Sequence, residues 1–351
     1  MTPLSRAAFQ HPEGASVRCE LCPHRCLLSE GSRGRCGVRE VRDGTLWTLV
    51  WGKAISLHPD PIEKKPLFHF MPGAASLSLA TVGCNLDCRF CQNHSISQAR
   101  PEDMTVATVP PGAVVDEARR IGARVIAYTY TEPTIFYEYA EDIAAAAAAA
   151  DIRNVFITNG FIEEAPLRRL LPLMDAANVD LKAFSDETYR LVLGGRLAPV
   201  LRTLRILREA GVWLEVTTLL VPGLNDGDEE LQAIAEFLAD LDPGIPWHVS
   251  RFHPDYRMTT GAATRPETIE RALAAGQRAG LQYIYPGNVS GHRAESTWCH
   301  ACGALLIRRQ GFRIGEVRCS DGCCPDCGVA IPGRIQGEPR RKNLVPGTEG
   351  E

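Results

Sequence analysis

The grouping of the cysteines constrains this chain more than any other feature. There are thirteen of them in three tight groups, and none occurs between Cys91 and Cys299. A secreted disulfide framework would usually be shorter and even in its cysteine count. Gaps of two and three residues are instead typical of metal ligands in a reducing compartment. We therefore expect a cytoplasmic metalloprotein.

Composition and charge argue against several functional classes. Of the 351 residues, 45% are hydrophobic and 23% are charged, which is ordinary for a globular protein. The formal net charge of −4 supplies no basic excess for a phosphate backbone, so a nucleic acid is not an expected partner. No run reaches the roughly 18 apolar residues of a membrane span, and the first residues do not resemble a signal peptide.

The chain divides by composition into five segments. They are a cysteine-rich metal-binding segment (1–45), a connector with some strand character (46–75), a strand-and-helix domain (76–295), a zinc-ribbon-like segment (296–333) and a polar tail expected to be disordered (334–351).

The large central segment predicts an α/β fold. Continuous apolar runs predict strands at 77–82, 125–130, 155–158, 178–181, 214–220, 247–251 and 283–285. Helical patterns lie between them, as where Leu231, Ile234 and Leu238 recur at helical spacing. Such alternation favours a parallel sheet covered by helices, closed or partly closed as a (β/α) barrel. Chemistry in such barrels lies at the carboxyl ends of the strands.

The central cysteine group follows the first of these strands. Cys84, Cys88 and Cys91 form a C-x3-C-x2-C loop, which can hold three corners of a [4Fe–4S] cluster and leave the fourth iron open. An electron carrier would normally cap all four irons, so an open iron indicates a binding site. Zinc bound with the help of His94, or a set of buried thiols, are the alternatives.

This loop, with Phe90 as its aromatic residue, resembles the signature of the radical S-adenosylmethionine (SAM) superfamily. The resemblance implies that the amine and carboxylate of SAM chelate the open iron, with the adenine near Phe90. It also implies an oxidoreductase-type mechanism. An electron passing through the cluster of Cys84, Cys88 and Cys91 breaks the sulfonium bond to the 5′ carbon, giving methionine and a 5′-deoxyadenosyl radical that abstracts hydrogen from a substrate.

The end of the second strand carries an acidic residue that fits the same superfamily. The resemblance implies that Glu132 meets the methionine amine of SAM. Tyr130 and Thr131 stand where the family typically has two glycines. Glu132 also suits the N-terminus of a helix that begins at Pro133, where an acid favours the helix dipole.

Later strand ends resemble the pyruvate formate-lyase activating enzyme branch. There, the positions of Thr158, Asn159, Asp180 and Lys182 meet the ribose and carboxylate of the cofactor. A structural ion pair at the barrel rim is the other interpretation of Asp180 and Lys182. His253 lies where that branch places a cofactor-proximal histidine, and it is equally consistent with a rim histidine that has no such role.

Two outer cysteine groups predict further metal sites. The first has four ligands in eighteen residues, which suits either zinc or a closed second [4Fe–4S] cluster: Cys19, Cys22, Cys26 and Cys36. The second has the spacing of a structural zinc ribbon: Cys299, Cys302, Cys324 and Cys327. Cys319 and Cys323 are left without an assigned role.

The chain as a whole resembles the AmmeMemoRadiSam system radical enzymes. The resemblance covers residues 17–333 and is carried by the segments 19–26, 36–39, 60–70, 84–93 and 331–333. It implies Memo-like and AMMECR-like proteins as partners, and a reductant such as a ferredoxin or flavodoxin.

The substrate stays open at this level. One hypothesis is activation of a partner protein through a glycyl radical, and another is modification of a small molecule or a different protein residue. An iron–sulfur electron carrier without SAM turnover and a zinc-knuckle nucleic-acid binder are rivals from other classes. Assays of SAM turnover and of salt-dependent binding would separate them.

Overall fold

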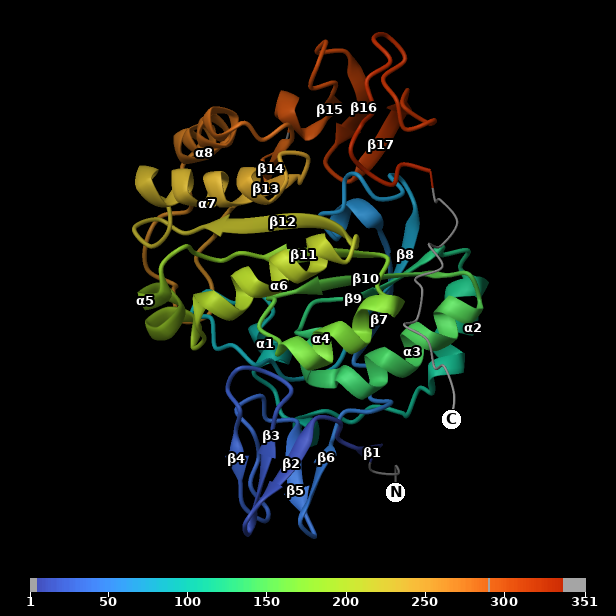
Figure 1. Cartoon of the computed structure of the whole chain (residues 1–351), viewed down its shortest axis with the longest axis vertical. Coiled ribbons are helices and arrows are strands. Elements are labelled where there is room, and N and C mark those ends of the chain that lie inside the picture. The colour runs from blue at the N-terminus through green and yellow to red at the C-terminus, as the bar shows by residue number, and fades with distance from the viewer. Residues whose placement is uncertain (1–4, 290, 337–351) are drawn as a thin grey trace, which may run out of the picture.

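The computed structural model describes residues 5–289 and 291–336, so most of the predicted tail at 334–351 lies outside the described residues. Figure 1 shows three regions along the long axis of the molecule. Two small antiparallel sheets lie at one end, the large α/β sheet forms the middle, and a third small sheet lies at the other end.

The central sheet has eight strands in the order β14-β13-β12-β11-β10-β9-β8-β7. Neighbours from β8 to β14 are parallel, and β7 runs antiparallel to β8. Within the described residues β7 and β14 remain separate edges, so the sheet takes the partial form of the predicted barrel. The strands are β7 (Ser56–Pro61), β8 (Ala75–Ala80), β9 (Val125–Tyr128), β10 (Arg153–Thr158), β11 (Ala176–Asp180), β12 (Trp213–Leu220), β13 (Trp247–Arg251) and β14 (Ile284–Gly287).

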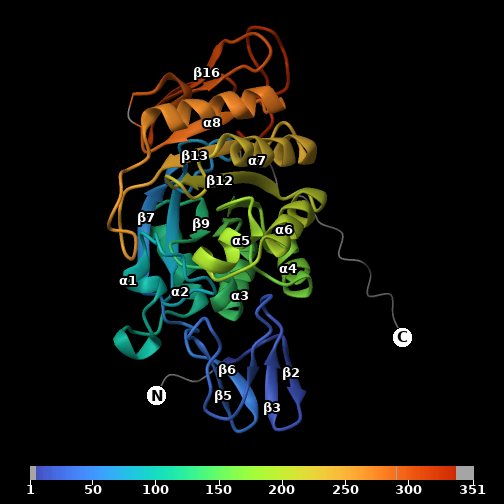
Figure 2. The same cartoon turned by 90° about the vertical axis from the view of Figure 1, so that its left-hand side faces the viewer.

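Helices follow the parallel strands and cover the outer face of the sheet, as Figure 2 shows from the side. In α7, Leu231, Ile234 and Leu238 are buried on one face, as their spacing predicts. The α-helices are α1 (His94–Ser97), α2 (Pro111–Arg120), α3 (Tyr137–Ala149), α4 (Glu164–Leu170), α5 (Asp186–Thr188), α6 (Leu197–Glu209), α7 (Asp228–Leu241) and α8 (Pro266–Ala279). Short turns are η1 (Ile62–Lys64), η2 (Pro101–Asp103), η3 (Pro133–Phe136), η4 (Leu171–Leu173), the π-helical η5 (Tyr189–Leu193) and η6 (Arg293–Glu295).

Both faces of the sheet are buried, which explains its continuous apolar strands. In β9, Ile126 and Tyr128 belong to the large core shared with the helices. Val125 and Ala127 point the other way, into a cluster with residues of the segment 62–71. That segment therefore packs against the inner face of the sheet, opposite the face that the helices cover.

The predicted connector at 46–75 is divided between two sheets. Its first strand, β6 (Thr45–Thr48), pairs with β5 (Arg39–Arg42) across a turn at Asp43 and Gly44, which both have positive φ. An Asp-Gly pair with this backbone makes a tight hairpin. Its second strand, β7, joins the central sheet. The remaining N-terminal strands are β1 (Ser5–Arg6), β2 (Gln10–Glu13), β3 (Ser16–Cys19) and β4 (Leu27–Leu28).

The C-terminal sheet is antiparallel and packs against one edge of the central sheet. Its strands are β15 (Thr297–Trp298), β16 (Leu305–Gln310) and β17 (Arg313–Val317). Leu306 and Cys319 share a buried cluster with Tyr283, Tyr285 and Phe68. Among the helices of the described residues, none has the length and apolar character needed to cross a membrane.

Candidate active site

A cavity of about 330 Å³ lies at the carboxyl ends of the central strands. The loop after β8 and the ends of β9 to β13 form its walls. This is the place where a parallel α/β sheet is expected to hold its chemistry. The polar, aromatic and cysteine residues of the walls include Lys64, Lys65, Cys84, Cys88, Phe90, Cys91, Asn93, Tyr130, Glu132, Thr158, Asn159, Asp180 and Lys182.

The three cysteines of the central loop all face this cavity. The Leu86 amide donates to the Cys84 Sγ at 3.4 Å, and the Ser97 hydroxyl lies 3.3 Å from the Cys91 Sγ. Burial raises the pKa of Cys88 to about 12, although Lys182 opposes the rise. The thiol is thus protonated in the metal-free chain, and metal binding must displace that proton.

The surroundings of the loop fit a cluster better than zinc. His94, the fourth ligand of the zinc alternative, directs its Nδ1 to the carbonyl oxygen of Cys91 at 3.2 Å and stacks on Tyr256. Across the described residues, no histidine or acid forms a close metal-binding group with the three cysteines. Three sulfurs beside an open cavity suit three corners of a [4Fe–4S] cluster, with the fourth iron facing the cavity.

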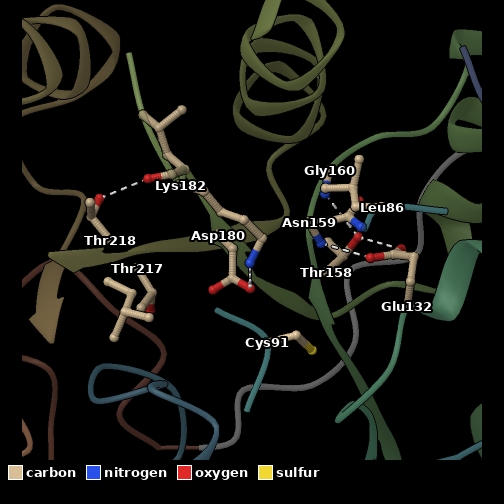
Figure 3. A network of polar contacts seen from close by, with 12 residues as sticks. Leu86, Cys91, Glu132, Thr158, Asn159, Gly160, Asp180, Lys182, Thr217 and Thr218 are labelled. Atoms are coloured by element: carbon tan, nitrogen blue, oxygen red, sulfur yellow. Dashed lines mark hydrogen bonds and ion pairs between the residues drawn. The ribbon is translucent and has the colours of Figure 1, made fainter. Parts of the chain in front are cut away.

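Glu132 is 2% exposed and accepts hydrogen bonds from three residues. Its Oε1 accepts from the Thr134 amide and hydroxyl at 3.0 and 2.6 Å and from the Thr158 hydroxyl at 2.7 Å. Its Oε2 accepts from the Asn159 amide at 2.7 Å (Figure 3). Burial raises the pKa of this carboxyl, and the donors oppose the rise. Glu132 therefore caps η3, and it also lines the cavity.

Tyr130 has a backbone conformation that glycine adopts without strain. Its φ is +64°, in the left-handed region that favours glycine, and it is one of the two positions where the resemblance led us to expect glycine. Its hydroxyl donates to the Asp60 carboxylate, and its ring lies under the Lys65 ammonium at 4.3 Å. Its carbonyl oxygen accepts from the side-chain Nδ2 of Asn93 at 2.8 Å. These contacts hold the strained backbone of Tyr130 in place.

Asn159 links the third strand end to the cysteine loop. Its Nδ2 donates to the Asn85 Oδ1 at 2.8 Å and lies 3.8 Å from the Cys84 Sγ. Its Oδ1 accepts from the Phe161 amide at 2.9 Å. Asn159 is thus positioned by two neighbours and touches a cysteine of the central loop.

Asp180 and Lys182 form an ion pair within the cavity wall. The Lys182 Nζ lies 2.8 Å from the Asp180 Oδ2. Although burial opposes it, the Asp180 carboxylate holds the pKa of Lys182 above its usual value. Asp180 and Lys182 therefore form the ion pair that one interpretation predicted, and they also line the cavity.

The structure does not bring every predicted residue together. Phe90 is 4% exposed and lines the cavity, whereas His253 is exposed and lies outside the cavity wall, so its cofactor role stays a prediction. Lys64 and Lys65 line the cavity although we assigned them no role from the sequence. Burial lowers the pKa of Lys65 to about 8, against the effect of Asp60.

The outer cysteine groups do not line this cavity. The C-terminal set brings four sulfurs within 4.8 Å of one another: Cys299, Cys302, Cys324 and Cys327. Cys319 is buried in the core of the sheet instead, and Cys323 is also outside this set. The N-terminal set lines a second, smaller cavity: Cys19, Cys22, Cys26 and Cys36.

Comparisons with known proteins match the part of the chain that supplies most of the cavity walls. The model of the radical SAM superfamily matches residues 78–238. Protein MJ0808 of Methanocaldococcus jannaschii is 44% identical over 326 residues, 92% of this chain and 97% of that protein. Pyruvate formate-lyase 1-activating enzyme of Escherichia coli (strain K12) is 22% identical over 222 residues, 58% of this chain and 89% of that one.

One similar solved structure is a domain of pyruvate-formate lyase-activating enzyme from Bacteroides vulgatus ATCC 8482. It has a TM-score of 0.40 and 18% identity, and the match covers 46% of this chain and 98% of that chain. The residues matched by the family model contain the cysteine loop and the ends of β9 to β12.

Proposed function

The chain belongs to the radical SAM superfamily, and on that premise we propose that it cleaves SAM at a [4Fe–4S] cluster held by Cys84, Cys88 and Cys91. The observation that carries the proposal is three sulfurs lining a cavity whose other walls offer polar groups to a second ligand. When bound, the cluster supplies the electron that breaks the bond between the sulfonium and the 5′ carbon, giving methionine and a 5′-deoxyadenosyl radical.

Glu132 is the group that would hold the amine of SAM. Within the described residues its Oε2 accepts a single hydrogen bond, from Asn159, so that oxygen keeps a lone pair for an ammonium group. Charge-assisted hydrogen bonds of this kind are among the stronger ones. Because three residues already hold the carboxylate, binding would cost little reorganisation.

The opposite wall would position the rest of the cofactor. Lys182 offers a cation to the SAM carboxylate, and Asp180 offers acceptors to ribose hydroxyls. Phe90 gives the adenine an apolar neighbour. Apolar side chains also line the cavity, at Leu86 and Leu219, and help to exclude water that would compete in the reaction.

The substrate that we propose is a partner protein. The Escherichia coli relative is named as an activating enzyme of another enzyme, which supports a protein substrate. Memo-like and AMMECR-like proteins are the candidates that the AmmeMemoRadiSam resemblance suggests. The electron would come from a cytoplasmic reductant such as a ferredoxin or flavodoxin.

Binding of SAM to the reduced cluster tests the proposal. The protein would be reconstituted anaerobically, reduced and titrated with SAM while its electron paramagnetic resonance (EPR) spectrum is recorded. We expect SAM to change the signal, because it would bind directly to the open iron. An unchanged spectrum at saturating SAM would favour the electron-carrier alternative.

The identity of the substrate needs a separate experiment. Each candidate partner would be produced in deuterated medium and mixed with reduced enzyme and unlabelled SAM. Deuterium in the 5′-deoxyadenosine would support a protein substrate. Transfer from a deuterated small molecule alone would contradict that part of the proposal.

A further inference from the structure

The C-terminal cysteines are spaced for a single ion. The Sγ atoms of Cys299 and Cys327 lie 3.6 Å apart, and those of Cys302 and Cys324 are also 3.6 Å apart. Four thiolates around one tetrahedral zinc at about 2.3 Å would lie roughly 3.8 Å from one another. This group therefore gives an internal reference, in the same chain, for the spacing of sulfurs that can surround a single ion.

The N-terminal cysteines are spaced more widely than that reference. The C-terminal set is the only group of three or more potential ligands gathered within 4.8 Å among the described residues. The N-terminal sulfurs instead surround a common cavity, lined by Cys19, Cys22, Cys26 and Cys36. A [4Fe–4S] cluster gives each thiolate its own iron, so its ligands stand further apart than those of one ion.

A buried arginine beside this cavity has two donor atoms without acceptors. Arg39 is 1% exposed and lines the cavity with the four cysteines. Its Nη2 donates to the Glu138 carboxylate at 2.6 Å and to the Ala8 carbonyl at 2.7 Å. Its Nε and Nη1 are buried and have no hydrogen-bond partner among the described residues. Buried donors without acceptors are costly, and an anionic group with several acceptor atoms in the adjoining cavity would relieve that cost.

We propose that Cys19, Cys22, Cys26 and Cys36 hold a second [4Fe–4S] cluster, whose sulfur atoms accept hydrogen bonds from Arg39. The spacing of the sulfurs and the unpaired donors both favour a group larger than a single zinc ion. With four cysteine ligands every iron is capped, so this cluster transfers electrons and does not bind SAM.

The second site lies directly against the central loop. A Cβ atom at Gly83 would come within 2.8 Å of the Cys36 carbonyl oxygen, and the His24 Nε2 lies 2.7 Å from the Asn85 carbonyl oxygen. Standard bond lengths then place the Cα atoms of Cys36 and Cys84 no more than about 11 Å apart. The second cluster is therefore placed to pass one electron from a ferredoxin or flavodoxin to the central cluster. This role rests on the proposed function, whereas the cluster itself does not.

Metal analysis of a variant without the central ligands tests the site. The full chain carrying Cys84→Ala, Cys88→Ala and Cys91→Ala would be reconstituted anaerobically with iron and sulfide. We expect about four irons and four sulfides per chain to remain, against about eight of each in the wild type. The reduced variant should show a cluster EPR signal that SAM does not change.

Two further variants make the result specific. Adding Cys22→Ser and Cys26→Ser to the triple variant should remove the remaining iron, with folding checked by circular dichroism. Adding Cys299→Ser and Cys302→Ser instead should leave the iron unchanged. Zinc without sulfide at the N-terminal site, or no iron in the triple variant, would overturn the proposal. Neither result bears on SAM cleavage by the wild type, so the two proposals fail separately.

Discussion

The central cysteine loop and the C-terminal cysteine group use sulfur in opposite ways. The loop directs three thiols into a cavity of about 330 Å³ that it shares with Glu132 and Lys182. The C-terminal group directs four thiols at one another, within 4.8 Å. The first arrangement leaves room for a second ligand, and the second is complete once an ion is bound. On our proposal, the surroundings of the sulfurs, more than their number, separate a reactive site from a structural one.

The largest expected effect comes from removing the reactive sulfurs. Replacing Cys84, Cys88 and Cys91 with alanine should bring 5′-deoxyadenosine formation below detection. The fold should survive, because the core between sheet and helices is built mainly from other residues. Product chromatography and thermal denaturation would measure the two properties. A triple variant that still forms the product would mean that the loop is not the reactive site.

Removing the C-terminal sulfurs should have the converse effect. The variant Cys299→Ser/Cys302→Ser should lose zinc and become sensitive to protease in the C-terminal sheet, because so small a sheet folds largely through its metal. SAM cleavage should remain measurable in protein that stays soluble. If the variant keeps zinc and protease resistance but loses all cleavage, these cysteines take part in the reaction, and the comparison fails.

A smaller effect is expected at the cavity wall. Glu132→Ala should weaken SAM binding by roughly 1.5–3 kcal/mol through the lost charge-assisted contact. From the sequence alone we expect Glu132→Ala to weaken SAM binding more than it weakens folding. In the structure the variant also leaves the Thr158 hydroxyl and the Asn159 backbone amide buried without their acceptor, which lowers the free energy of unfolding. Binding titration and denaturant unfolding would measure the two losses.

Thr134→Val serves as the control for this variant. It removes one hydroxyl donor from the Glu132 Oε1 and leaves the carboxylate in place. It should therefore lower stability with little change in SAM affinity. If Glu132→Ala binds SAM normally but unfolds at a lower denaturant concentration, Glu132 serves only as a helix cap.

The smallest effect is expected at Tyr130. Tyr130→Phe keeps the ring beside Lys65 and removes only the hydroxyl that donates to Asp60. We expect the free energy of unfolding to fall by about 1 kcal/mol, below the usual range for a hydrogen bond to a charged group, because Lys64, Lys65 and Ser78 still donate to the Asp60 carboxylate. Denaturant unfolding at constant metal content would detect it. A loss several times larger would show that this hydroxyl, more than the ring, maintains the positive φ.

Much of the fold was predictable because its signals are local. Continuous apolar runs mark strands buried on both faces, so each parallel strand was found near its observed position. Carboxyl ends of neighbouring strands meet, which brought together the polar residues predicted there: Glu132, Thr158, Asn159, Asp180 and Lys182. Asp180 and Lys182 form an ion pair and Glu132 caps η3, yet all three also line the cavity, because each side chain has more than one polar atom or hydrogen-bonding site.

The rest depended on contacts between distant segments. The strand β7 carries two prolines and was assigned to a connector, since its antiparallel pairing with β8 leaves no local pattern. That pairing brings Lys64 and Lys65 to the cavity wall. Both lie in the segment 60–70 that carries the resemblance, but nothing in its sequence places it beside the cysteine loop. His253 follows β13 as expected, but its side chain is exposed. Strand order thus predicts where a residue lies better than where it points.

The most direct test is SAM turnover by the reconstituted wild-type chain. Anaerobic protein with its iron and sulfide content verified would be reduced with dithionite and incubated with SAM, beside the triple variant of the central loop. The account predicts 5′-deoxyadenosine and methionine in equal amounts from the wild type and neither product from the variant. Absence of 5′-deoxyadenosine from cluster-loaded, reduced wild-type protein would contradict the account.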